Sequence, residues 1–529
     1  MPPESPGSTE PPTGHAGTAA ESDPSVTERS GQETGLVSGR SALRRLGLFA
    51  LAFGSGFAVL TIEIAGARLI APVFGLSAVP WTAVIGVILA ALAVGNHLGG
   101  RLADSGAIPL ATVLAVAGFT GALPVLGGDL PWMARDVLGF IPGAVASALI
   151  LFAPPVLCLG AVVPYLVQAD TESLRAVGRR AGDVSAAATA GSIAGTFLTG
   201  FVLLPLFPLP VLLGLTAAAL FGMAAVSGRL LEPGPRGAQL VVAALTLGAL
   251  GYVAARPTSG TLHAQQTVYS AVRVTEREWS DGRMVREMFQ NGGSSSAEYI
   301  DTGESAHEYV TASLQLLEPV VDDVGSMLVL GGAALTLPVV FLKRQPTMEI
   351  TVVEIDPAVT ELAERYFAYG EGSYPNINVE HEDGRVWLRR SEDLFDVVYL
   401  DVFDHLLTVP WTMVTREALA DMSSRLAPDG LFVANILSPL AGPGVGFLER
   451  FRATLGEVFA AERVFLTDPG LDPGVTQNLV VIASNTPEAI PPTTLRESPV
   501  AAAGRPLTDA WAPVEYLQAK VFLRGLGWR

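Results

Sequence analysis

Three carboxylates in the C-terminal half of the chain, Glu354, Asp383 and Asp401, come shortly after apolar segments. The apolar runs are short and rich in β-branched residues, as expected of strands buried on both faces of a parallel sheet. Four such runs cover residues 327–330, 349–353, 395–400 and 430–434, with helix-length segments between them. Alternating strands and helices predict a mostly parallel, doubly wound sheet, whose ligands bind beyond the carboxyl ends of the strands. We therefore expect the three carboxylates to meet at that edge.

Residues at the ends of three predicted strands have the types that bind a nucleoside. Glu354, after the second strand, can accept hydrogen bonds from both hydroxyls of a ribose. Gly331 and Gly332 end the first strand and let the backbone approach a ligand closely. Asp383 and Gly384 follow a third strand, expected between the runs 349–353 and 395–400, where the carboxylate can meet an adenine amino group. Because Gly-Gly and Asp-Gly pairs also occur in ordinary turns, only their order and spacing together predict the site.

The segment Asp401-Val-Phe-Asp404 resembles the catalytic strand end of the spermidine synthase family of polyamine aminopropyltransferases. The resemblance covers residues 268–438 and implies a Rossmann-like, methyltransferase-type α/β domain. It implies that Asp401 orients the attacking amine or takes its proton, and that Asp404 binds an ammonium group of the substrate. It also implies a homodimer.

The same resemblance implies a co-substrate and a reaction. Glu354 would bind the ribose of decarboxylated S-adenosylmethionine, and Asp383 would bind its adenine amino group, beside the glycines of the strand ends. The family's Tyr-His-Glu segment, which borders the amine pocket, is similar to the segment here that contains Glu304, His307 and Glu308. The implied activity is transfer of an aminopropyl group to an amine such as putrescine, with methylthioadenosine as by-product.

An acidic site suits such cationic substrates. An alkylammonium has a pKa near that of lysine and is not nucleophilic until it loses a proton, which a positioned carboxylate can accept. Residues 257–529 contain 37 Asp and Glu against 20 Lys and Arg, a net charge of −17 out of −18 for the whole chain. Such a field attracts polyamines and repels nucleic acid. Generic acidic solubility is the alternative explanation.

Two features depart from the family pattern. Ala333 and Ala334 stand where family members carry a third glycine and then an acid that faces the aminopropyl end of the donor, and the loop 292–296 differs from the family's glutamine-bearing loop. Two other functions therefore stay open: a catalytically degenerate module that binds polyamine or nucleoside and regulates a membrane bundle, and a methyltransferase that uses S-adenosylmethionine itself. The pair Asp401 and Asp404 argues against methyl transfer, because a cationic acceptor explains two carboxylates better.

The N-terminal half is predicted to be a membrane domain. Residues 1–42, rich in Pro, Gly, Ser, Thr and Glu, predict a disordered cytoplasmic tail rather than a signal peptide. Residues 43–256 hold seven apolar segments long enough to span a bilayer, near 46–70, 80–99, 107–127, 143–167, 184–205, 208–228 and 237–255. Residues 257–529 form the predicted synthase-like domain. Cys158, the single cysteine, excludes an intrachain disulfide, and the sequence offers no metal site.

Polar residues within the apolar segments should face the interior of the bundle. Glu63 and Arg68 lie in the first segment, where they predict either a path for a cation or a structural pair. Dense glycine and alanine, as in residues 191–195, predict close helix contacts in lipid. Residues 100–104 resemble a short loop signature of major facilitator transporters, and the chain is similar to bacterial proteins that fuse such a segment to a spermidine-synthase-like domain.

Basic residues indicate the orientation. Alternate loops carry Arg40, Arg44, Arg45, Arg101, Arg175, Arg179, Arg180, Arg229 and Arg236, whereas the other loops carry Arg135, with Arg256 after the last segment. The positive-inside rule then places the N-terminus in the cytoplasm. Seven crossings would place the acidic domain outside the cell, away from a cytosolic donor, and a helix count that differs by one would place it inside.

Overall fold

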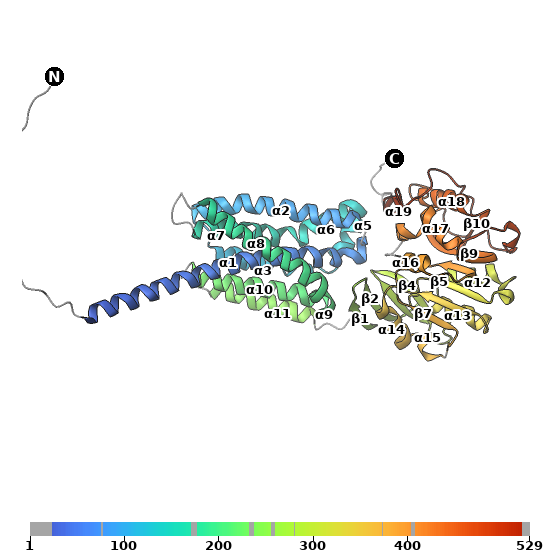
Figure 1. Cartoon of the computed structure of the whole chain (residues 1–529), viewed down its shortest axis with the longest axis horizontal. Helices are drawn as coiled ribbons and strands as arrows, with labels where there is room; N and C mark the ends of the chain where they lie inside the picture. Colours follow the sequence, from blue (N-terminus) through green and yellow to red (C-terminus); the bar gives the residue numbers. More distant parts are fainter. Residues whose placement is uncertain are drawn as a thin grey trace, which may run out of the picture.

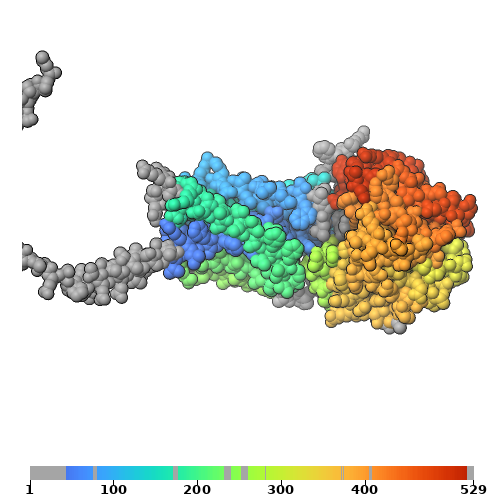
Figure 2. Space-filling model, viewed as in Figure 1, coloured from blue at the N-terminus to red at the C-terminus, as the bar shows by residue number. Residues whose placement is uncertain are grey.

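The computed structural model describes residues 24–75, 78–170, 177–231, 237–254, 260–279, 281–372, 374–403 and 408–520. Figure 1 shows an elongated bundle of helices with an α/β domain at one end of it. The space-filling view in Figure 2 shows the same two bodies, with the helical bundle in blue to green and the C-terminal domain in yellow-green to red. The chain thus separates an apolar helical part from a mixed α/β part.

The bundle is built from long helices that run roughly along its long axis and from shorter ones between them (Figure 1). They are α1 Pro24–Phe74, α2 Ala78–Ser105, α3 Leu110–Thr120, α4 Leu123–Leu126, α5 Leu130–Leu138, α6 Phe140–Leu151, α7 Ala153–Asp170, α8 Val177–Leu198, the π-helical turn Thr199–Leu203, α9 Leu204–Leu206, α10 Leu209–Leu230 and α11 Gly237–Ala254. Helix α1 packs along α8, and a Cβ added to Gly191 would lie 1.9 Å from the carbonyl oxygen of Phe53. The prediction of a close helix contact at residues 191–195 is confirmed.

Among the described residues, five helices are long and apolar enough to cross a membrane, not the seven that the sequence predicts. They are Leu43–Phe74, Pro80–Ser105, Ala153–Asp170, Val177–Leu206 and Leu209–Leu230. A sixth is added if Leu110–Leu126 and Leu130–Leu138, which meet at 71°, form one broken span. The predicted segment 143–167 is divided between α6 and α7, because Pro154 and Pro155 have no N–H to continue the hydrogen bonds of α6. The last predicted segment, 237–255, coincides with α11, which is counted here only over its apolar stretch Leu240–Gly251.

Charged residues join three helix ends at the end of the bundle remote from the α/β domain (Figure 1). The buried carboxylate of Asp170, at the end of α7, lies 3.6 Å from Arg45 of α1 and 3.1 Å from Arg180 of α8. Arg44 donates a hydrogen bond to the carbonyl oxygen of Ala169 at 3.0 Å. The basic ends of these helices are thus gathered at one end of the bundle.

The C-terminal domain contains a seven-stranded sheet in the order β10-β11-β9-β8-β5-β6-β7. Its strands are β5 Ser326–Leu330, β6 Glu349–Val353, β7 Ile377–Glu380, β8 Phe395–Leu400, β9 Leu426–Ser438, β10 Ala461–Leu466 and β11 Gln477–Ser484. Strands β5 to β9 pair in parallel, and β10 and β11 are antiparallel. The predicted Rossmann-like, mostly parallel sheet is therefore present, and the four predicted runs are parts of β5, β6, β8 and β9.

Helices cover both faces of this sheet, and each face has its own apolar core. One face packs against α12 Glu308–Leu317, α13 Thr336–Arg344 and α14 Pro357–Tyr366, with α15 Ala368–Glu371 beside them. The other packs against α16 Gly384–Arg390, α17 Arg416–Ser423, α18 Gly446–Val458 and α19 Val514–Ala519. These two layers hold the carboxyl ends of the parallel strands in fixed positions.

A second, antiparallel sheet precedes the main one, and the sequence analysis did not predict it. It runs β1 Thr261–Gln266, β2 Ala271–Glu278, β3 Met284–Gln290 and β4 Gly293–Tyr299 in the order of the chain. Val272, Val274 and Met288 are buried in the same core as β5 and β6. This packing brings the turn between β3 and β4 over the crevice at the strand ends.

Candidate active site

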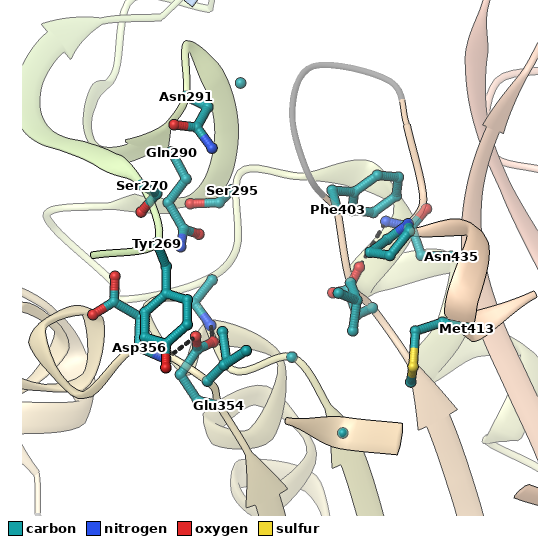
Figure 3. Close-up of a pocket in the computed structure, with 18 of the residues that line it drawn as sticks. Tyr269, Ser270, Gln290, Asn291, Ser295, Glu354, Asp356, Phe403, Met413 and Asn435 are labelled. Atoms are coloured by element: carbon teal, nitrogen blue, oxygen red, sulfur yellow. Dashed lines mark hydrogen bonds between the residues drawn. The ribbon is translucent and has the colours of Figure 1, made fainter. Parts of the chain in front are cut away.

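A cavity of about 550 Å³ lies at the carboxyl ends of the parallel strands. Figure 3 shows its walls: Gln290, Asn291 and Ser295 from the small sheet on one side, Glu354 and Asp356 after β6, and Phe403, Met413 and Asn435 opposite. The predicted residues Gly331, Glu354, Asp383, Gly384, Asp401 and His307 all line it. The crevice expected from the order of strands and helices is therefore where these side chains meet.

Glu354 organises the turn after β5. Its Oε2 accepts hydrogen bonds from the N–H groups of Gly332 and Ala333, at 2.9 and 3.1 Å, and its Oε1 accepts one from the N–H of Asp356 at 3.0 Å. Burial raises the pKa of Glu354, and these three N–H groups oppose the rise. About one of the four acceptor sites of the carboxylate is left for a ribose hydroxyl, so the predicted contact with both hydroxyls needs a rearrangement of these bonds.

Two glycine positions in the site have identifiable backbone requirements. Gly331 has φ 91°, and a Cβ there would lie 2.4 Å from the carbonyl oxygen of Asp401. Gly332 does not line the cavity, but it supplies an N–H to Glu354. Asp383 caps α16 by accepting hydrogen bonds from the N–H groups of Arg385 and Val386, and Gly384 follows as the first residue of that helix.

Ala333 adopts a left-handed backbone conformation, with φ 43°, at the position where the family pattern has its third glycine. A Cβ is strained in this region, whereas Ala334 is not among the residues with positive φ and is buried. We expect Ala333→Gly to stabilise the chain by about 0.5–1 kcal/mol, since relief of strain exceeds the entropy cost of glycine. Ala334→Gly should lower the thermal midpoint of the full chain in detergent, so opposite shifts are expected from neighbouring alanines. Equal shifts would contradict this reading of the turn.

Asp401 is the centre of a hydrogen-bonded chain. Its Oδ2 accepts a hydrogen bond from the hydroxyl of Tyr309 at 2.7 Å, and its Oδ1 accepts one from Nδ2 of Asn435 at 3.0 Å. The amide of Asn478 in turn donates to Oδ1 of Asn435 at 2.9 Å. Burial raises the pKa of Asp401 to about 6, and the bonds from Asn435 and Tyr309 oppose the rise. The carboxylate is thus held in one orientation and is poised to exchange a proton near neutral pH.

His307 lies beside this chain. Its Nε2 is 2.9 Å from the hydroxyl of Ser294, and its ring centre is 5.7 Å from that of Tyr309. Burial lowers the pKa of His307 to about 4, although Glu287 opposes the shift, so the imidazole is neutral at physiological pH. A neutral imidazole can donate or accept one hydrogen bond but adds no positive charge to the cavity.

Some predicted residues lie elsewhere. Glu304 and Glu308 are exposed and do not line the cavity; Glu308 is the first residue of α12, with His307 at its N-cap. Asp404 lies outside the described residues. The sequence alone assigned no role in this site to Tyr309, Asn435 or Asn478. Asn435 could have been recognised from the sequence, because it is a polar residue within the apolar run of β9.

The chain is similar in sequence to known proteins of one family. Residues 307–450 match the family model of the spermine/spermidine synthase domain. A Bifidobacterium longum protein named "Probable polyamine aminopropyl transferase" is 32% identical over 177 residues, which are 33% of this chain and 38% of that protein. The polyamine aminopropyltransferase of Mycobacterium tuberculosis is 29% identical over 412 residues, 73% of this chain and 76% of that protein. A crystal structure of a probable spermidine synthase from Corynebacterium glutamicum is 24% identical and covers 44% of this chain and 81% of that chain, with a TM-score of 0.38.

These similarities indicate the class of the protein. Residues 307–450 are similar to the spermine/spermidine synthase domain, and the similar proteins support an enzyme of the aminopropyltransferase class. The chain spans less than half of the Bifidobacterium protein and about three quarters of the Mycobacterium protein. The Mycobacterium match is longer than residues 257–529, so the similarity extends into the helical bundle.

Proposed function

We propose that the chain is a membrane-anchored polyamine aminopropyltransferase that transfers an aminopropyl group from decarboxylated S-adenosylmethionine to an amine such as putrescine. One observation carries the proposal: the described residues that line the cavity include five carboxylates and neither lysine nor arginine. The carboxylates are those of Glu354, Asp356, Glu382, Asp383 and Asp401. Both substrates are cationic, and a cavity of this charge attracts them and compensates their desolvation.

The same charge opposes the methyltransferase alternative. S-adenosylmethionine differs from the decarboxylated donor by a carboxylate, which would find no cationic side chain among the described lining residues. A carboxylate without a partner beside five acids is electrostatically unfavourable. The site therefore supports the decarboxylated donor better than the ordinary one.

The proposed reaction follows from the position of Asp401. The alkylammonium of the acceptor loses a proton to the Asp401 carboxylate, and the nitrogen of the resulting neutral amine attacks the aminopropyl carbon that is bonded to the sulfonium. A carbon–nitrogen bond forms as the carbon–sulfur bond breaks, and the electron pair stays on sulfur, leaving neutral methylthioadenosine. Tyr309 and Asn435 hold the carboxylate toward the amine, so that orientation and proton transfer act together.

We expect the pH dependence of kcat/KM to show an acid limb with an apparent pKa of about 6, the value raised by burial of Asp401. Below it the carboxyl is protonated and cannot accept the proton of the amine, so the rate falls as the pH is lowered. Tyr309→Phe removes a hydrogen bond that lowers this pKa, and the limb should move to higher pH. If the acid limb keeps its position in this variant, the group that titrates is not Asp401.

Calorimetric titration of the full chain in detergent with both forms of the donor tests the function. We expect the decarboxylated form to bind about 5- to 30-fold more tightly, since one unfavourable charge contact costs on the order of 1–2 kcal/mol. Asp383→Ala should weaken that binding. Preference for ordinary S-adenosylmethionine would favour methyl transfer, and binding of polyamine without turnover would favour the regulatory module, which the replacement of an acid by Ala334 also suggests.

We propose that the bundle spans a membrane with its N-terminus in the cytoplasm. Support comes from its apolar helices and from the arginines gathered at the end remote from the α/β domain. Asp393→Cys in a Cys158→Ala background tests the side of the exposed Asp393 loop with an impermeant maleimide. This orientation puts the opposite end of the bundle, which carries the α/β domain, outside the cell, so it predicts labelling of intact cells. Labelling only after lysis would contradict the orientation and place the domain beside a cytosolic donor. Labelling of intact cells would count against conventional aminopropyl transfer.

A further inference from the structure

The end of α1 contacts the wall of the cavity at two places. The guanidinium of Arg68 donates hydrogen bonds to the carbonyl oxygens of Thr267 and Val268, at 3.2 and 2.8 Å. Gly292, in the turn between β3 and β4, has φ 82°, and a Cβ there would lie 2.2 Å from the carbonyl oxygen of Pro72. Both loops of the small sheet that approach the cavity therefore rest against one membrane helix.

The turn bonded by Arg68, residues 267–270, is also bonded from the side of the cavity. The hydroxyl of Thr267 donates to Oδ2 of Asp356 at 2.5 Å and accepts hydrogen bonds from the N–H groups of Tyr269 and Ser270. Tyr269, Ser270 and Asp356 line the cavity. In Figure 3 the ring of Tyr269 lies at the wall formed by Glu354 and Asp356. The turn is thus held between a membrane helix and the acidic end of the site.

We propose that Arg68 is a positioning residue for the nucleoside end of the site: it fixes the 267–270 turn and, through it, holds Tyr269 against the bound nucleoside. An aromatic ring beside Glu354 can cover the ribose and exclude water from it. The inference rests on the proposed function for the identity of the ligand, but the positioning of the turn does not depend on it. The membrane bundle would then be a part of the active site rather than an anchor alone.

The position of Arg68 explains why a charged side chain occurs in an apolar helix. Its guanidinium carries five N–H donors in a fixed fork, which matches two successive carbonyl oxygens, whereas a lysine offers a single compact ammonium. Arg44, on the same helix but at the end of the bundle remote from the α/β domain, donates a hydrogen bond to the carbonyl oxygen of Ala169 at 3.0 Å. It is therefore a matched control for loss of an arginine that bonds a backbone carbonyl.

Hydrogen–deuterium exchange of the full chain in detergent tests the positioning directly. We expect Arg68→Gln to speed exchange of the Tyr269 and Ser270 amides by about tenfold or more, because the turn opens more often when its carbonyls lose their partner. Arg68→Lys should have an intermediate effect, and Arg44→Gln none. If Arg68→Gln does not fold, Arg68→Lys and Gly292→Ala, which presses on Pro72, still report on the contact. Unchanged exchange in a folded Arg68 variant overturns the proposal.

A double-mutant cycle tests the link to the ligand. We expect Tyr269→Ala and Arg68→Gln each to raise the Kd of decarboxylated S-adenosylmethionine by roughly tenfold, as for loss of one aromatic contact, and to leave kcat nearly unchanged. The double variant should bind no more weakly than Tyr269→Ala, since Arg68 acts through Tyr269. Additive effects would contradict that route. A wild-type chain that binds no nucleoside would defeat the proposed function, whereas the exchange rates would still decide whether Arg68 positions the turn.

Discussion

Asp401→Asn is expected to lower kcat by about 10²- to 10⁴-fold, the range usual for loss of a positioned general base. The asparagine keeps the shape of the side chain and can still accept a hydrogen bond from Tyr309, but it cannot accept the proton of the amine. Binding of decarboxylated S-adenosylmethionine should change little, because the proposed nucleoside contacts lie with Glu354 and Asp383. Single-turnover rates and calorimetric titration on the same preparation separate the two effects.

Asp393→Asn is the matched control for this substitution. Asp393 is exposed and precedes the amino end of β8, whereas Asp401 follows the carboxyl end of the same strand. The control should therefore retain full turnover. Unchanged turnover in Asp401→Asn would refute the assigned role of Asp401 and with it the proposed mechanism. Loss of turnover together with loss of donor binding would show instead that the site had collapsed.

Glu354→Ala is expected to raise the Kd of the donor by about 100-fold. A hydrogen bond to a charged group contributes about 1.5–3 kcal/mol, and each 1.4 kcal/mol is a factor of ten in Kd. The alanine also removes the acceptor for the N–H groups of Gly332, Ala333 and Asp356, so the turn that approaches the nucleoside loses its support. Calorimetric titration with methylthioadenosine, which lacks the aminopropyl group, isolates this part of the site.

Glu361→Ala provides the comparison, since Glu361 is an exposed carboxylate on α14, the helix that follows Glu354. It changes the net charge by the same amount but lies away from the cavity lining. We expect it to leave the affinity for methylthioadenosine unchanged. Equal weakening by the two substitutions would indicate a general effect of charge and would remove Glu354 from the nucleoside site.

The sequence predicted the Rossmann-like sheet and brought Glu354, Asp383 and Asp401 to one edge of it. This was possible because strand ends in a parallel sheet share an edge, so the order of apolar runs and carboxylates contains the geometry. The sheet and the edge at which the three carboxylates meet therefore follow from short segments of the sequence. The break between α6 and α7 was missed, because the predicted span 143–167 ran through Pro154 and Pro155.

The partners of the site residues needed the tertiary structure. Tyr309 and Asn435 reach Asp401 from elements 92 and 34 residues away, and no sequence period links such positions. The backbone strain at Ala333 likewise depends on the path of the turn rather than on the residue type.

The sequence by itself determined the class of fold, the acidic character of the C-terminal half and the apolar character of the N-terminal half, because burial pattern and charge are properties of local segments. Only the tertiary structure decided that the small antiparallel sheet would line the cavity and that Arg68 would bond to residues about 200 positions later. Packing between distant elements decides such contacts, because each depends on the shape of both partners. The link between the bundle and the site is therefore a property of the assembled fold.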